Sequence, residues 1–172
     1  MSCGNADFLH GLSALQALKL HFSTSALVAV DIPRTCAALQ SCMGLCELLL
    51  ANLSCTSKQL ASALQRMPLL HTLELGQMLL LDSLSFLSAG TLASTLTSFS
   101  LGNTAGQLPL RELHKVHALR HLQHLSLHYH SFDEELHPWM LELYQPWPSG
   151  CHILPQLQTF DFQYPPDEHD HQ

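Results

Sequence analysis

Apolar residues recur along the chain in the pattern L-x-x-L-x-L, with polar or small residues between them. Because residues two apart on a strand share a face, each copy predicts a short strand whose apolar side chains point into a core. The first positions of the copies are separated by 30, 25, 26, 26 and 35 residues. The six copies are Leu15, Leu18 and Leu20; Leu45, Leu48 and Leu50; Leu70, Leu73 and Leu75; Leu96, Phe99 and Leu101; Leu122, Leu125 and Leu127; Leu157, Phe160 and Phe162.

The segments between these strands carry apolar residues at helical spacing. Segment 79–92 is less regular and contains Gly90, which favours a short helix or a 3₁₀ turn. Pro33 is predicted to open a helix that carries Cys36, Leu39 and Met43, and Ser57 to cap one in which Leu60, Leu64 and Met67 fall on one face. A third helix is predicted to start at Pro109, followed by Leu110, Leu113 and Val116. A fourth, which Asp133 caps, is predicted from Glu134 to Tyr144 with Leu136, Met140 and Leu143 inward.

The first and last steps depart from the period. An extra apolar run, 26–32, lengthens the first step, and a proline-rich loop around Trp147 lengthens the last. Residues 1–164 are therefore predicted to form one domain of about six units, followed by a disordered polar tail, 165–172. We expect the core ends to carry a minimal cap, to continue into a longer array, or to be covered by a partner.

From Leu12 to Tyr164 the chain resembles the leucine-rich-repeat family, whose repeats are 20–29 residues long. The spacing and helical connections look most like the intracellular subclass of F-box/leucine-rich-repeat and ribonuclease-inhibitor-like proteins. The resemblance implies an α/β solenoid, curved, with parallel strands on the concave face and helices or 3₁₀ turns on the convex face. It also implies protein binding, and in F-box members recognition of a ubiquitin-ligase substrate. The array begins near Met1 with no F-box before it, so that role would need a longer chain or a separate adaptor.

Side chains that alternate with the leucines are expected to line the concave face, where a protein partner would bind. The alternative interpretation of this face is a solvated sheet without a ligand. Tyr129 and Tyr164, at its edge, are the predicted aromatic anchors. The candidate partner-binding residues are Lys19, His21, Glu47, Glu74, His124, Ser126, His128, Tyr129, Asp161 and Tyr164.

Composition narrows the function classes. The net charge of −7 argues against nucleic-acid binding, which requires clustered Lys and Arg. No apolar run reaches the roughly 18 residues of a membrane span, and the first ten residues lack the features of a signal peptide. The six cysteines do not form paired clusters, so we expect a cytoplasmic or nuclear setting and buried, reduced thiols at Cys36 and Cys42.

The sequence offers few candidates for a metal site or a catalytic site. His114, His117 and His121 fall on a predicted helix and His128 and His130 on a strand, so the two groups are not expected to share a metal ion. The sequence contains no H-E-x-x-H, G-x-S-x-G or glycine-rich phosphate motif. We therefore predict a non-enzymatic interaction module without cofactor or metal, its oligomeric state open. The second hypothesis is a structural or capping part of a longer repeat protein with no binding role of its own.

Overall fold

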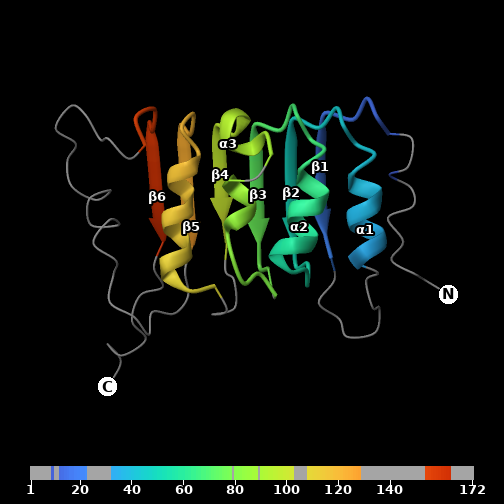
Figure 1. Ribbon diagram of the computed structural model, residues 1–172, viewed down its shortest axis with the longest axis horizontal. Helices are drawn as coiled ribbons and strands as arrows, with labels where there is room; N and C mark the ends of the chain where they lie inside the picture. Colours follow the sequence, from blue (N-terminus) through green and yellow to red (C-terminus); the bar gives the residue numbers. More distant parts are fainter. Residues whose placement is uncertain are drawn as a thin grey trace, which may run out of the picture.

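The computed structural model describes residues 9, 12–22, 32–78, 80–88, 90–102, 108–128 and 154–163. Within these residues, six parallel strands form one open sheet in which each strand pairs with the next along the chain. This confirms the prediction of an α/β fold with a parallel sheet. The strands in Figure 1 are β1 (Ala17–His21), β2 (Glu47–Ala51), β3 (Thr72–Gly76), β4 (Ser98–Leu101), β5 (His124–His128) and β6 (Thr159–Gln163).

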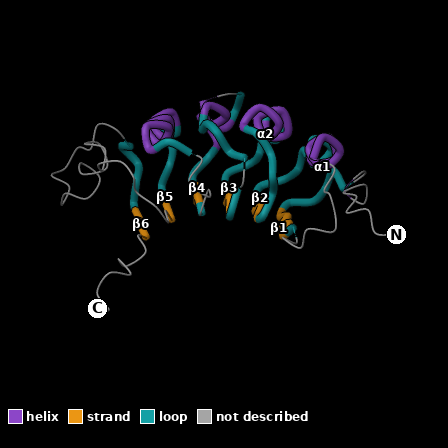
Figure 2. Tube along the Cα trace, turned by 90° about the horizontal axis from the view of Figure 1, so that it is seen from below, coloured by secondary structure: helices purple, strands orange, loops and turns teal. Residues whose placement is uncertain are grey.

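Helices form a second layer on one face of the sheet. The described helices are α1 (Ile32–Leu39), α2 (Ser57–Leu64), the 3₁₀ helix η2 (Ser85–Ser88), α3 (Leu92–Thr95) and the 3₁₀ helix η3 (Leu110–Ala118). Figure 2 shows the two layers following an arc, with the strands on its inner side and the helices on its outer side. None of these helices covers the inner face of the sheet, which we call the open strand face.

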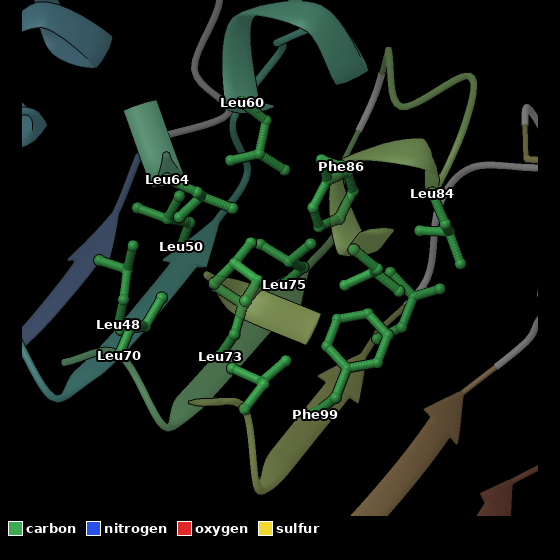
Figure 3. Close-up of a cluster of buried hydrophobic side chains, with 14 of the residues drawn as sticks. Leu48, Leu50, Leu60, Leu64, Leu70, Leu73, Leu75, Leu84, Phe86 and Phe99 are labelled. Atoms are coloured by element: carbon green, nitrogen blue, oxygen red, sulfur yellow. The ribbon is translucent and has the colours of Figure 1, made fainter. Parts of the chain in front are cut away.

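The apolar residues of the strands stack in register on the face that meets the helices. Leu73 of β3 pairs with Leu48 of β2 on one side and with Phe99 of β4 on the other, and all three are no more than 1% exposed. Leu60 and Leu64 of α2 close this core from the helix layer (Figure 3). Each fully buried leucine or phenylalanine stabilises the fold by about 1.5–3 kcal/mol relative to its exposed state.

The core thins toward both edges of the sheet. Leu18 and Leu20 of β1 are only partly buried, and so are Phe160 and Phe162 of β6. Each of these strands has a neighbour on one side only, since they are first and last in the sheet order. Edge leucines and phenylalanines therefore contribute less burial than the same positions in β2 to β5.

The predicted cap of α2 was wrong by one residue. Thr56 Oγ1 accepts a hydrogen bond from the Gln59 N–H at 3.4 Å, and Gln59 Oε1 accepts one from the Thr56 N–H at 2.9 Å. This reciprocal pair is a capping box, which satisfies two N–H groups at the start of the helix. Ser57 is instead the first residue of α2. Leu60 and Leu64 are buried, as predicted.

α1 is shorter than predicted. Cys36 and Leu39 lie on the helix and are buried, but Met43, which the helix was predicted to carry, lies beyond its end and is 56% exposed. The reason is that α1 ends at Leu39 and the chain tightens into a turn, in which the Ser41 N–H and hydroxyl both donate to the carbonyl oxygen of Ala38. Met43 lies beyond that turn, outside the helical periodicity.

The later connections are mostly 3₁₀. The helix predicted after Pro109 is present with Leu113 and Val116 buried, but it is the 3₁₀ helix η3. Segment 79–92 contains η2, as predicted, and Gly90 adopts a positive φ of 64° before α3. Four predicted segments lie outside the described residues: the apolar run 26–32 (except Ile32), the helix from Glu134 to Tyr144, the loop around Trp147 and the tail 165–172.

Candidate binding face

The open strand face carries three columns of side chains, one from each strand position that alternates with the core residues. The strand pairing places the side chains that alternate with the leucines in these columns, on the face where they were expected; Gly102 lies one residue beyond the end of β4. The first column is Ala17, Glu47, Thr72, Ser98, His124 and Thr159; the middle one is Lys19, Leu49, Glu74, Ser100, Ser126 and Asp161; the third is His21, Ala51, Gly76, Gly102, His128 and Gln163.

A shallow cavity of about 120 Å³ lies on this face at the β1, β2 and β3 end of the sheet, and we call it the β1–β3 hollow. It brings together three of the predicted residues, Lys19, Glu47 and Glu74, one from each of the strands β1, β2 and β3. Leu49 and Thr72 also line it, and neither was among the predicted binding residues. Their place in the columns was the available signal, because Leu49 lies between Lys19 and Glu74 in the strand register.

Predicted residues of β5 and β6 meet at the other end of the face, in what we call the β5–β6 polar cluster. Ser126 Oγ lies 2.9 Å from Nε2 of His128 and donates to Oδ2 of Asp161 at 3.4 Å. The same histidine nitrogen lies 3.8 Å from Oδ2 of Asp161. Gln163 adds an N–H donor to that carboxylate at 3.2 Å.

A serine, a histidine and an aspartate in contact invite comparison with a catalytic triad. In a triad the serine and the aspartate bond to different nitrogens of the imidazole, so that one nitrogen takes a proton while the other is held by the carboxylate. In this cluster, Nε2 of His128 faces both Ser126 and Asp161. The side chains of His128 and Asp161 are also 39% and 57% exposed. The contacts of this cluster are those of a polar surface, without the geometry that activates a serine.

His124 lies apart from that cluster, on the first column. Its Nδ1 is 2.8 Å from Oγ1 of Thr159 on the neighbouring strand. His21 lies in the third column at the opposite edge, on β1. The sequence therefore placed these histidines on the correct face, whereas the contact with Thr159 depends on side-chain rotamers. The predicted anchors Tyr129 and Tyr164 lie outside the described residues.

Small residues form the middle of the third column. A Cβ atom added to Gly102 would lie 3.1 Å from Cα of Gly76 and 3.3 Å from the carbonyl oxygen of Leu75. The Gly102 N–H donates to that same oxygen at 2.6 Å. The two backbones approach closely here because glycine has no side chain. The surface at these glycines therefore lacks projecting side chains, whereas His21 and His128 project at the two ends of the column.

The thiols and the remaining histidines lie elsewhere. Cys36, Cys42 and Cys55 are buried, which confirms the predicted role of Cys36 and Cys42 as core residues. Burial raises the pKa of Cys36, and burial together with the neighbouring Cys36 raises the pKa of Cys55 to about 12. In the part of the chain that the structure describes, no three His, Cys, Asp or Glu side chains are grouped so as to hold a metal ion.

A polar bridge that the sequence analysis did not anticipate joins α2 to the next connection in the helix layer. The Ser57 N–H and hydroxyl donate to Oδ1 of Asp82 at 3.1 and 2.6 Å, and the Ser83 N–H donates to the Ser57 hydroxyl at 2.8 Å. Hydrogen bonds from the Ser57 hydroxyl and N–H hold the pKa of the Asp82 carboxyl below its ordinary value. The charged form of Asp82 thus stabilises the start of α2.

The bridge continues into η3. Ser83 donates its hydroxyl to Oε2 of Glu112 at 2.6 Å, and Lys115 donates to the same oxygen at 2.7 Å. Partial burial raises the pKa of Glu112, but the hydrogen bonds from Lys115, Ser83 and the Leu84 N–H outweigh it, so that the pKa lies below its ordinary value. These contacts connect neighbouring segments of the helix layer.

Comparison with known proteins gives no family assignment: no family model, no curated protein and no solved structure significantly matches the chain. None of the described helices has both the length and the apolar character that a membrane span requires. The site's own geometry is therefore the basis for a functional proposal.

Proposed function

We propose that the chain is a leucine-rich-repeat solenoid that acts as a non-enzymatic protein-interaction module, with the open strand face as its binding surface. The observation that carries this proposal is the division of the sheet into two chemically different faces. Leucine and phenylalanine fill the face that meets the helices, whereas the other face carries mainly charged, hydroxyl and histidine side chains, with Leu49 and a few small residues among them. A broad, polar, open surface on a rigid sheet suits recognition of another protein.

The solenoid part of the proposal rests on sequence spacing together with register. Four successive strands, β2 to β5, begin 25, 26 and 26 residues apart, and all paired strands are parallel and neighbours in sequence. Backbone contacts repeat with this spacing: the Thr97 N–H donates to the carbonyl oxygen of His71, and the Gln123 N–H donates to that of Thr97. Stacked units that bury a shared core are typical of leucine-rich repeats.

The resemblance to F-box/leucine-rich-repeat proteins gives the finer proposal. In this view the open strand face recognises a substrate, or serves as an adaptor, in a ubiquitin-ligase-type assembly in the cytoplasm or nucleus. The β1–β3 hollow and the β5–β6 polar cluster are the two places where side chains of such a partner would dock. Both are on the same face, so one extended partner surface can reach them together.

A second candidate function has its own supporting observation. The partly buried apolar residues of β1 and β6 leave the ends of the core less covered than its centre. A structural or capping segment of a longer repeat protein would present such ends to its neighbouring units. In that case the open strand face would have no partner of its own.

The test compares two variants of the full chain. Glu74→Lys combined with Ser126→Lys changes the charge at both docking places, and Lys58→Glu reverses an exposed charge on α2 in the helix layer. We call the double substitution Glu74→Lys/Ser126→Lys the strand-face variant. Affinity capture from lysate, followed by mass spectrometry, should recover the same partners with the wild type and with Lys58→Glu. The strand-face variant should lose these partners.

Thermal unfolding must show that both variants remain folded. Equal recovery with all three proteins would overturn the assignment of the binding surface. Concentration-dependent self-association, together with recovery of chaperones alone, would favour the structural function.

A further inference from the structure

The β1–β3 hollow has an apolar base and a charged rim. The side chain of Leu49 contributes apolar surface, and Glu47 and Glu74 contribute carboxylates from adjacent strands. Leu18 and Leu48 also line the hollow, but their side chains face the core on the other side of the sheet. Within the described residues, neither carboxylate makes a hydrogen bond or an ion pair. The hollow therefore presents two unpaired negative charges beside a surface that can pack against a hydrocarbon chain.

The spacing of the two carboxylates follows from the strand register. Glu47 pairs with Thr72, and Glu74 lies two residues further along β3, so the glutamates are diagonal neighbours on the same face. Strands ~4.8 Å apart with a rise of ~3.3 Å per residue separate such Cβ atoms by roughly 8 Å. Two flexible glutamates at this distance can converge on one planar group placed between them.

A guanidinium group fits these features better than an ammonium group. Its five donors lie in a rigid, planar fork that can bond to two carboxylates at once, whereas the lysine ammonium is a compact point charge. The aliphatic part of an arginine side chain can pack on Leu49, which is half-buried between Lys19 and Glu74. The cavity volume of about 120 Å³ accommodates the end of one such side chain rather than a folded element.

We propose that the β1–β3 hollow accepts an arginine side chain from an extended segment of the partner protein. The proposal rests on the proposed function and deepens it, since it names the chemistry that one half of the open strand face recognises. The chain's net charge of −7 agrees with a basic partner, because long-range attraction would favour its approach.

Lys19 sets a limit on this recognition. Its side chain lines the same hollow on the β1 side, directly across Leu49 from Glu74. A positive charge there repels an incoming guanidinium and offsets part of the attraction of the two carboxylates. Removal of the charge by Lys19→Met should therefore tighten binding by about two- to threefold, the size expected for an exposed charge pair.

The test uses the full chain and a defined probe. Acetyl-Gly-Gly-Arg-Gly-Gly-amide is titrated into ¹⁵N-labelled protein, with the citrulline and lysine versions of the same peptide as comparisons. We expect amide shifts confined to Glu47, Leu49 and 72–74. The citrulline peptide, which keeps the shape but has no charge, should bind about tenfold more weakly. Added salt should weaken binding of the arginine peptide.

Matched variants separate the hollow from general charge. Glu47→Gln combined with Glu74→Gln keeps the side-chain shape and should weaken the arginine peptide about tenfold. Asp82→Asn removes an exposed carboxylate from the helix layer, on the opposite side of the sheet from the hollow, and should change the affinity by less than about twofold. Shifts spread over the surface, an unchanged affinity in the double variant, or equal binding of the lysine or citrulline peptide would overturn the proposal.

The capture experiment decides the proposed function independently. If partners are lost with the strand-face variant while the peptide titration fails, the open strand face binds proteins but the arginine assignment is wrong. If the peptide binds as expected while capture is unaffected by the strand-face variant, the hollow recognises arginine but the open strand face is not the surface that holds the captured partners.

Discussion

Single residues at the ends of the strands carry unusual backbone conformations. Asn52 after β2 and Gln77 after β3 have φ values of 60° and 50°, in the left-handed region. Asparagine occurs in this region more often than most residues, whereas an ordinary side chain there lies too close to the following carbonyl oxygen, which costs about 1–2 kcal/mol. Gln77 is therefore a strained position, and its side chain is exposed, so its replacement leaves the core unchanged.

Gln77→Gly is expected to stabilise the fold. Glycine adopts positive φ without a steric penalty, although it also increases the entropy of the unfolded chain. The net gain should be about 0.5–1 kcal/mol, which raises the melting temperature by about 1–4 °C in a chain of this size. Thermal unfolding followed by circular dichroism measures the change.

The matched control for this change is Gln65→Gly. Gln65 is also exposed, but it has a φ of −56° at the end of α2. Glycine there should lower stability by about 0.5–1 kcal/mol. A loss of stability in both variants would contradict the interpretation of Gln77 as strained.

At the scale of elements, the polar bridge connects α2 to the turn before η2 and then to η3. Asp82 and Glu112 act as acceptors at its two halves, and the pKa of each is lowered in the folded chain. A carboxyl whose folded pKa is lowered adds stability above its unfolded pKa, about 4, and that stability is lost as the pH falls through the folded value. The free energy of unfolding should therefore decrease as the pH is lowered below about 4.

Asp82→Asn tests this linkage. At pH 6 the variant should melt about 2–4 °C below the wild type, as expected for weaker hydrogen bonds worth about 1 kcal/mol or less at an exposed site. Its melting temperature should also change less between pH 6 and pH 3 than that of the wild type. Glu74→Gln serves as the control, because the Glu74 carboxylate accepts no hydrogen bond from the described residues. Identical pH profiles for the wild type and Asp82→Asn would rule out the bridge as the source.

Strand positions were predictable from sequence, and side-chain contacts were not. Leucines such as Leu73 must face the core, so the alternation fixed both the strand and the face of Glu74 beside it. The contact between Ser126 and Asp161 depends on rotamers, about which strand periodicity says nothing. The α2 cap was misplaced because neighbouring threonine and serine are both good caps, and only the reciprocal bond to Gln59 decides between them.

At the scale of the whole molecule, the burial of a strand position depends on how many neighbouring strands cover it. The first and last strands of the sheet have a neighbour on one side only, so the same position contributes most in the strands between them. Phe99 and Phe160 occupy the same slot of the strand register, in β4 and β6. Phe99 is 1% exposed, whereas Phe160 is only partly buried and lies on the last strand of the sheet order.

These two phenylalanines allow a direct comparison of the centre of the core with its edge. Phe99→Ala should destabilise the chain by about 3–5 kcal/mol, because it removes a fully buried ring and leaves a cavity. Phe160→Ala should cost about half as much, since water already reaches part of its ring and the cavity can open to solvent. Urea unfolding of both variants gives the free energies, provided that the slope of the transition stays unchanged. A loss at Phe160 as large as that at Phe99 would mean that the β6 end of the core is fully covered in solution, which would remove the observation that favours the structural function.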